Sequence, residues 1–188
     1  YLREVAVFLE AVTNEYDDAD LRTLPLSSSP EINYNKPDAR FPTITNYDLA
    51  LIRWTLDATA EMANELEEGD DAAHLVDLLN EMPELSVGED GKLLVAKDYP
   101  LKESHRHFSH LMAIHPLGLV DPSQGDHAKR IVRASLADLD RLGTSLWTGY
   151  SFSWLGSMHA RAKDGAKAEE ALDIFAKAFV LRNSFHCN

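Results

Sequence analysis

The chain is poor in cysteine, in long apolar runs and in positive charge, and each shortage narrows what the protein can be. Cys187 is the single cysteine among 188 residues, so neither an internal disulfide nor a cysteine-based metal site can form. No run of eighteen apolar residues occurs, so no transmembrane helix is expected. Eighteen Lys and Arg against 31 Asp and Glu give a net charge of −13, which argues against nucleic acid and anionic membranes as partners. A neutral substrate or a protein partner is compatible with this composition.

What is present is a globular composition, with 45% apolar and 26% charged residues. A chain of 188 residues is long enough for one domain with its own core. It begins at Tyr1 inside what resembles a helix and ends at Asn188 without a helix cap or a polar tail. We therefore expect residues 1–188 to be a single domain that is a fragment of a larger one, with any targeting signal lying elsewhere.

Apolar residues recur at helical spacing over most of the chain. This spacing predicts helices over residues 2–15, 45–69, 71–82, 126–142, 151–163 and 166–180. A further helix is expected to open with a histidine-rich segment and to end before Pro116. Residues 21–44 carry four prolines and no period, and a loop of this length is more often functional than a plain connection.

One short segment reads as strand. Residues 85–87 and 92–95 flank an Asp-Gly step, which predicts a small β-hairpin. The chain is therefore expected to be all-α with one hairpin, built from stacked αα-hairpins. Periodicity alone leaves open whether these form a bundle, a solenoid or an arc of an α/α toroid.

Glu31 is the first candidate for chemistry. It follows Pro30 in the long loop, with little positive charge next to it in the sequence. A carboxylic acid in a partly apolar pocket has a raised pKa and can donate a proton to a leaving group. The alternative is an ordinary solvated glutamate or a cap for a following turn.

The densest polar cluster is His105-Arg106-His107-Phe108-Ser109-His110, which precedes an apolar run. A helix starting near His107 would place His107, His110 and Ile114 on one face. Three interpretations stay open: Arg106 and His107 bind a sugar or another polyol, the histidines with Glu103 bind a metal, or the histidines satisfy buried carbonyls.

A third candidate region is aromatic. Trp147, Tyr150 and Trp154 surround Gly149 at the expected start of a helix. Aromatic rings stack on the apolar faces of sugars, and their N–H and O–H groups reach hydroxyls. Core packing is the alternative, and it is favoured for Phe152.

Taken in order, these segments resemble glycoside hydrolase family 95, the α-L-fucosidases with an (α/α)6 barrel. The family's Pro-Ser-x-Ser-Pro-Glu-Asn segment is similar to Leu26-Ser27-Ser28-Ser29-Pro30-Glu31-Ile32-Asn33, and its Asp-Gly-x-Leu hairpin to Asp90-Gly91-Lys92-Leu93. The His-Arg-His-x-Ser-His-Leu signature is unbroken at residues 105–111 and is the most specific element. A Gly-Trp-Ser-x-x-Trp segment resembles residues 149–154, and its later Ala-Arg resembles residues 160–161.

The resemblance implies a glycosidase that releases terminal α-linked L-fucose, or a related sugar such as L-galactose, with inversion. It implies Glu31 as general acid and Arg106 with His107 as the sugar grip. We expect His110, Tyr150 and Trp154 to support substrate binding. Neither a metal nor an organic cofactor is implied.

Further implications concern what surrounds this chain. The catalytic aspartate base of the family is expected beyond Asn188 and two assisting asparagines before Tyr1, so the isolated chain should be inactive. The substrate is expected to be an oligosaccharide or glycan, and the full protein to be exported. Ile32, Tyr150 and residues 94–96 depart from the family pattern, which bears on which sugar is bound. The rival hypothesis is a non-catalytic carbohydrate-binding or helical scaffold protein.

Overall fold

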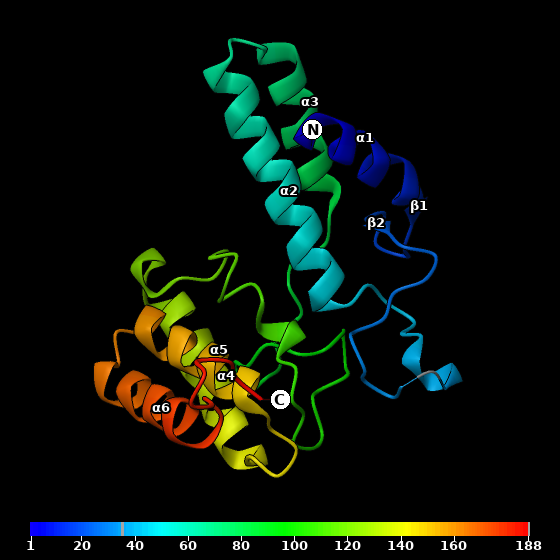
Figure 1. Ribbon diagram of the computed structural model, residues 1–188. Helices are drawn as coiled ribbons and strands as arrows, with labels where there is room; N and C mark the ends of the chain where they lie inside the picture. The colour runs from blue at the N-terminus through cyan, green and yellow to red at the C-terminus, as the bar shows by residue number, and fades with distance from the viewer. Residues whose placement is uncertain (35, 188) are drawn as a thin grey trace.

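The computed structural model describes residues 1–34 and 36–187, and this part of the chain is mostly helical (Figure 1). Its six α-helices are α1 (Leu2–Val12), α2 (Asn46–Glu65), α3 (Gly69–Glu81), α4 (Asp126–Leu142), α5 (Gly149–Arg161) and α6 (Gly165–Ala178). Each lies where the apolar spacing predicts a helix, with bounds that differ by a few residues. Single 3₁₀ turns occur at η1 (Pro37–Ala39), η2 (Ser109–Leu111) and η3 (Pro122–Gln124).

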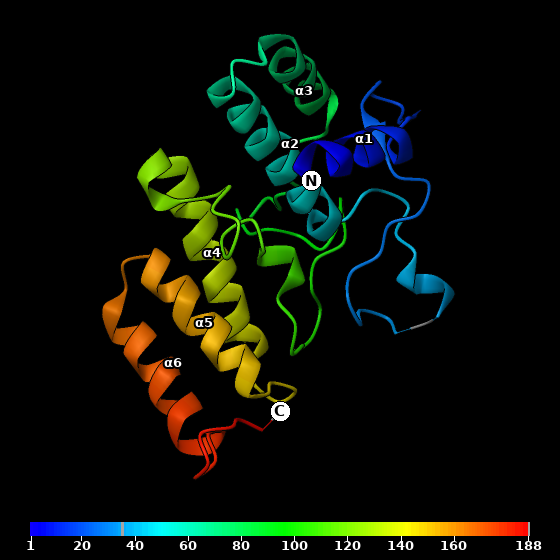
Figure 2. The same cartoon turned by 45° about the horizontal axis from the view of Figure 1, so that its top comes forward.

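The helices pack as two groups joined by a long irregular segment. Figures 1 and 2 show α2 beside α3 with α1 across them, and α5 beside α6 with α4 against that pair. Short links join α2 to α3 and α5 to α6, so both pairs are αα-hairpins. No helix within the described residues combines the length and the apolar character needed to cross a membrane.

Each group has its own apolar core. Around α2 and α3 the buried side chains include Leu49, Ile52, Leu56, Leu75 and Leu78. The larger core lies under α4 and α5, and it takes in side chains of the connecting segment as well as of the helices: Phe108, Leu111, Ile114, Val132, Leu136 and Met158. Burial of such side chains contributes roughly 1.5–3 kcal/mol each, so the histidine-rich segment is anchored by its own apolar residues.

The hairpin predicted over residues 85–95 is confirmed as a turn with one antiparallel bridge, whereas its strands are wrong. Val87 and Leu93 form an isolated antiparallel bridge, and Gly88 N–H donates to the Lys92 carbonyl at 2.8 Å, but no strands extend from this turn. The buried side chain of Asn46 takes the neighbouring backbone groups instead, since its amide donates to the Leu94 carbonyl at 2.8 Å and its oxygen accepts from Ser86 N–H.

The small antiparallel sheet lies elsewhere, between β1 (Glu15–Tyr16) and β2 (Arg22–Thr23). Its turn is built by Asp17, whose carboxylate accepts backbone N–H groups of Ala19 and Leu21 at 2.9 and 3.0 Å. An aspartate that bonds the backbone a few residues on is a common turn former. The sequence contains this signal directly after the helix expected over residues 2–15.

The predicted helix through His107 and Ile114 is also wrong. The segment makes one 3₁₀ turn, with i→i+3 hydrogen bonds such as Leu111 N–H to the Phe108 carbonyl at 2.7 Å. The chain between His107 and Pro116 is too short for a stable α-helix of its own. His107 lies before the 3₁₀ turn and His110 within it, so the two do not share one face of an α-helix.

Candidate active site

Glu31, Arg106 and His107 meet although 75 residues separate the first two in the sequence. Arg106 Nη2 lies 2.5 Å from Glu31 Oε2, and His107 Nε2 lies 3.1 Å from the same oxygen. All three side chains remain open to solvent, with exposed fractions of 42%, 47% and 30%. The candidate for the general acid and the two candidates for the sugar grip therefore lie at one place.

The ionisation of Glu31 differs from the expectation of an acid in an apolar pocket. The hydrogen bond from Arg106 is the largest influence and lowers the pKa of this carboxyl below its ordinary value, with His107 acting in the same direction. Partial desolvation opposes them but does not prevail. In the absence of a ligand Glu31 is therefore a carboxylate at neutral pH.

A strained turn presents Glu31. Glu31, Asn33 and Tyr34 all have left-handed backbone conformations, with φ of 60°, 59° and 53°. Such conformations cost roughly 1–2 kcal/mol for residues other than glycine, so the surrounding contacts must impose them. One such contact is the side-chain amide of Asn33, which donates to the Asp38 carbonyl at 2.7 Å across the loop.

Arg106 and His107 are held by their neighbours on both sides. His105 Nδ1 lies 3.1 Å from both the backbone N–H and the carbonyl oxygen of His107, so this ring bonds the His107 backbone. The hydroxyl of Ser151, in the first turn of α5, donates to the Arg106 carbonyl at 2.8 Å. The same hydroxyl accepts Thr148 N–H at 3.2 Å as part of the α5 capping box. The α5 N-terminus thereby fixes the backbone of the sugar-grip candidates, and Ser151 was not among the residues predicted for this site.

Of the two predicted aromatic contacts, only Tyr150 is open to a ligand. Its side chain is 46% exposed and its ring centroid lies 6.5 Å from that of His107. Trp154 is only 8% exposed, packs against Phe108 with 5.7 Å between the ring centroids, and donates Nε1–H to the His115 carbonyl at 2.9 Å. Trp154 therefore packs against Tyr150 from the core side, with 5.5 Å between the ring centroids.

His110 lies in the core and does not contact Glu31. It is 3% exposed, and its Nδ1 is buried without a hydrogen-bond partner among the described residues. Burial lowers the pKa of its imidazole to about 4, with Asp138 opposing and with His105 and Lys92 assisting this shift. A neutral, enclosed imidazole can shape the segment that carries Arg106, but it has no open path to a substrate.

The buried His110 should make the fold acid-sensitive. Its folded pKa lies below the unfolded value of 6.5, so between about pH 6.5 and pH 4 the unfolded chain binds the extra proton and stability falls as pH falls. The full effect is on the order of 3 kcal/mol. Urea unfolding at pH 7 and pH 4.5 should show a smaller loss of stability in His110→Gln than in the wild type. Equal losses in both proteins would contradict this assignment.

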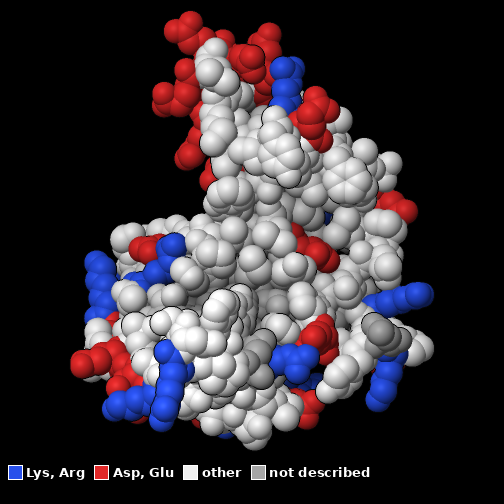
Figure 3. All heavy atoms as spheres, viewed as in Figure 1, with Lys and Arg blue, Asp and Glu red and all other residues white. Residues whose placement is uncertain are grey.

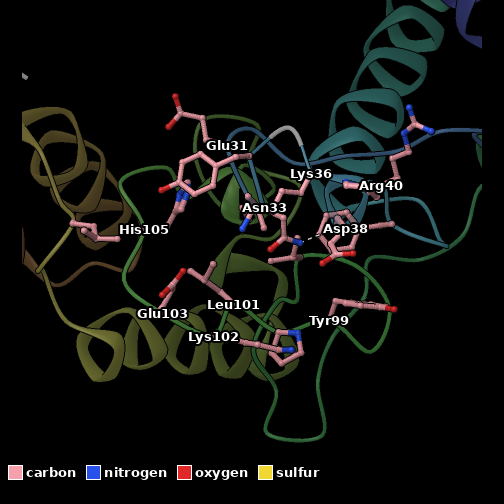
Figure 4. Close-up of a pocket in the computed structure, with 17 residues that line it drawn as sticks. Glu31, Asn33, Lys36, Asp38, Arg40, Tyr99, Leu101, Lys102, Glu103 and His105 are labelled. Carbon is pink, nitrogen blue, oxygen red and sulfur yellow. Dashed lines mark hydrogen bonds between the residues drawn. The ribbon is translucent and has the colours of Figure 1, made fainter.

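A cavity of about 610 Å³ opens beside Glu31, between the loop at residues 31–41 and the segment at residues 95–105 (Figure 4). This is within the usual size range of small-ligand sites. Its charged lining mixes signs, as the labelled side chains of Lys36, Asp38, Lys102 and Glu103 show. Acidic residues instead crowd the tip of the α2–α3 hairpin, at the top of Figure 3.

The described part of the chain contains no cluster of side chains that would support the metal-binding hypothesis. Within residues 1–34 and 36–187, no group of three or more His, Cys, Asp or Glu side chains is arranged to hold a metal ion. His105 bonds the backbone, His107 faces Glu31 and His110 is enclosed, so the three histidines point to different surroundings.

One comparison with known proteins identifies the family of this chain. No curated protein matches the chain. Residues 1–187 match the family described as Glycosyl hydrolase family 95 catalytic domain, which covers essentially the whole sequence. The family implies an (α/α)6 toroid, and the described part of this chain is mostly helical and contains two αα-hairpins. The chain therefore belongs to glycosyl hydrolase family 95.

Proposed function

We propose that this domain hydrolyses terminal α-linked L-fucose, or a related sugar such as L-galactose, with inversion at the anomeric carbon. The observation that carries the proposal is the meeting of one exposed carboxyl group, Glu31, with an exposed arginine and histidine. Arginine and histidine supply donors for sugar hydroxyls, and the exposed ring of Tyr150 beside His107 offers an apolar surface for the sugar.

Glu31 is assigned as general acid. Its proton passes to the glycosidic oxygen as the bond from that oxygen to the anomeric carbon breaks, and a water molecule attacks the opposite face of the sugar. A second carboxylate removes a proton from that water, and inverting enzymes hold the two carboxyl groups roughly 6.5–9.5 Å apart. On the family resemblance, we place this base beyond Asn188.

The Arg106–Glu31 ion pair must be weakened by the substrate before Glu31 can act as an acid. An acid must be protonated before it donates, whereas Arg106 favours the carboxylate. A sugar whose hydroxyl groups engage Arg106 would draw the guanidinium away from Glu31 and place a less polar ring beside the carboxyl group. Both changes raise the pKa of Glu31, so substrate binding itself would prepare the acid.

The stereochemical course of the reaction tests the proposal. The intact protein is incubated with α-L-fucosyl and α-L-galactosyl oligosaccharides, and proton NMR records the first anomer released. We expect the β-anomer to appear first and then equilibrate, and we expect the isolated 188-residue chain to release none. Initial release of the α-anomer would refute inversion, and sugar binding without release by the intact protein would support a binding module instead.

A further inference from the structure

Beneath the loop that carries Glu31, Ser27 and Asp48 are joined by a hydrogen bond that the proposed chemistry does not use. Asp48 lies in the first turn of α2, and its Oδ2 accepts the Ser27 hydroxyl at 2.7 Å. Resting on the proposed function, we infer that Ser27 and Asp48 form a positioning pair that fixes Glu31 for proton transfer to the leaving group. Neither residue contacts the reacting atoms in this assignment.

The pair lies inside the N-terminal cap of α2. Thr45 is the N-cap, and its side-chain oxygen accepts Asp48 N–H at 3.3 Å. In an ordinary capping box the residue at the Asp48 position would accept the backbone N–H of the N-cap. Here Thr45 N–H donates to Ser27 Oγ at 2.8 Å, and the Ser27 hydroxyl donates a hydrogen bond to the Asp48 carboxylate. A loop residue has thus been inserted into the cap of the helix.

The loop is tied down at more than one point around this pair. The Ser27 carbonyl accepts Phe41 N–H at 3.0 Å, which closes the loop that holds Glu31. The hydroxyl of Thr45 donates to the Ser28 carbonyl at 3.0 Å. Residues 27 and 28 therefore have a fixed place on α2, and Glu31 follows three residues later in its left-handed turn.

Burial makes a carboxylate costly at the position of Asp48. Ser27 is 1% exposed, and no Lys or Arg nitrogen among the described residues lies within 4.0 Å of the Asp48 carboxylate. Desolvation raises the pKa of Asp48, while hydrogen bonds from Ser27, the Ser28 backbone and Thr45 oppose that shift. A carboxylate without a cationic partner is unfavourable in such a place unless hydrogen bonds compensate for the lost hydration, and Asp48 has such bonds. They converge on the residues that lead to Glu31.

Leaving-group dependence separates positioning from general damage to the fold. A sugar leaving group needs protonation, whereas an activated aryl group with a low pKa departs with little help from an acid. For Asp48→Asn and Ser27→Ala we expect the ratio of kcat/KM for the aryl glycoside to kcat/KM for the disaccharide to rise roughly 10- to 100-fold, because small displacements of a catalytic group have effects of this size. Because the ratio compares two substrates in one sample, a partly unfolded fraction cancels.

Two controls make the result decisive. Asp57→Asn removes an exposed carboxylate from the same helix and should leave the ratio unchanged. In a Glu31→Gln background, Asp48→Asn should not raise the ratio further, because the acid that it positions is already gone. An unchanged ratio in Asp48→Asn and Ser27→Ala would overturn this inference alone, whereas failure of the wild type to hydrolyse either substrate would overturn the proposed function.

Discussion

Replacement of Glu31 by Gln should lower kcat for a disaccharide substrate by about 10²–10⁴-fold, the usual contribution of a general acid. Glutamine keeps the size of the side chain and can still accept a hydrogen bond from Arg106, but it has no proton of suitable acidity to give. Binding of the free sugar should change little, because Arg106, His107 and Tyr150 remain in place. Steady-state kinetics of the intact protein and calorimetry with L-fucose and L-galactose measure the two effects separately.

Glu103→Gln is the matched control for this variant. Glu103 lines the same cavity, is exposed, and forms no ion pair within the described residues, so its neutralisation changes the local charge equally. We expect near-normal turnover from it. If Glu31→Gln kept more than a tenth of the wild-type kcat on the disaccharide, Glu31 would not be the acid. Full activity on an activated aryl glycoside would, in contrast, agree with loss of the acid alone.

The helices could be predicted from the sequence because apolar residues recur along them at helical spacing, and these residues form the buried face that stabilises each helix. In α4, Ile131, Val132, Leu136 and Leu139 recur at helical spacing, and all four are buried where the helix packs on the core. The same spacing gave a wrong helix for the histidine-rich segment. There, backbone groups form hydrogen bonds with side chains from other elements, as the Arg106 carbonyl does with Ser151 on α5. Such tertiary contacts have no local signature.

The candidate site was predicted by residue type and resemblance, but its electrostatics were not. A polar loop with a single glutamate does not reveal that Arg106 approaches its carboxylate and reverses the expected direction of the pKa shift. The burial of Trp154 and His110 likewise depends on how α5 and the segment after Arg106 pack together. The sequence contains a Ser-rich run before Glu31 and, later, Thr45 and Asp48 three residues apart, but only the fold connects them through Ser27.

Replacement of Arg106 by Gln should lower kcat/KM about 10–150-fold and, in the same protein, move the basic limb of its pH profile upward. Hydrogen bonds to a charged group contribute roughly 1.5–3 kcal/mol, which sets the first effect through loss of the sugar grip. The second effect, the upward move of the basic limb, is seen in kcat/KM because the pH dependence of kcat/KM reports the pKa values of the free enzyme. Activity requires protonated Glu31 and so falls as pH rises through its pKa. Arg106 lowers that pKa, so its removal raises it.

Two variants separate the charge of Arg106 from its geometry. Arg106→Lys keeps a positive charge but loses the planar fork of donors, so kcat/KM should fall while the basic limb stays near its wild-type position. Arg40→Gln removes a cation that lines the same cavity without pairing with Glu31, and solvent screening should leave the limb unchanged. A basic limb that does not move in Arg106→Gln would mean that it reports another group, and the coupling between sugar binding and the protonation of Glu31 would have to be abandoned.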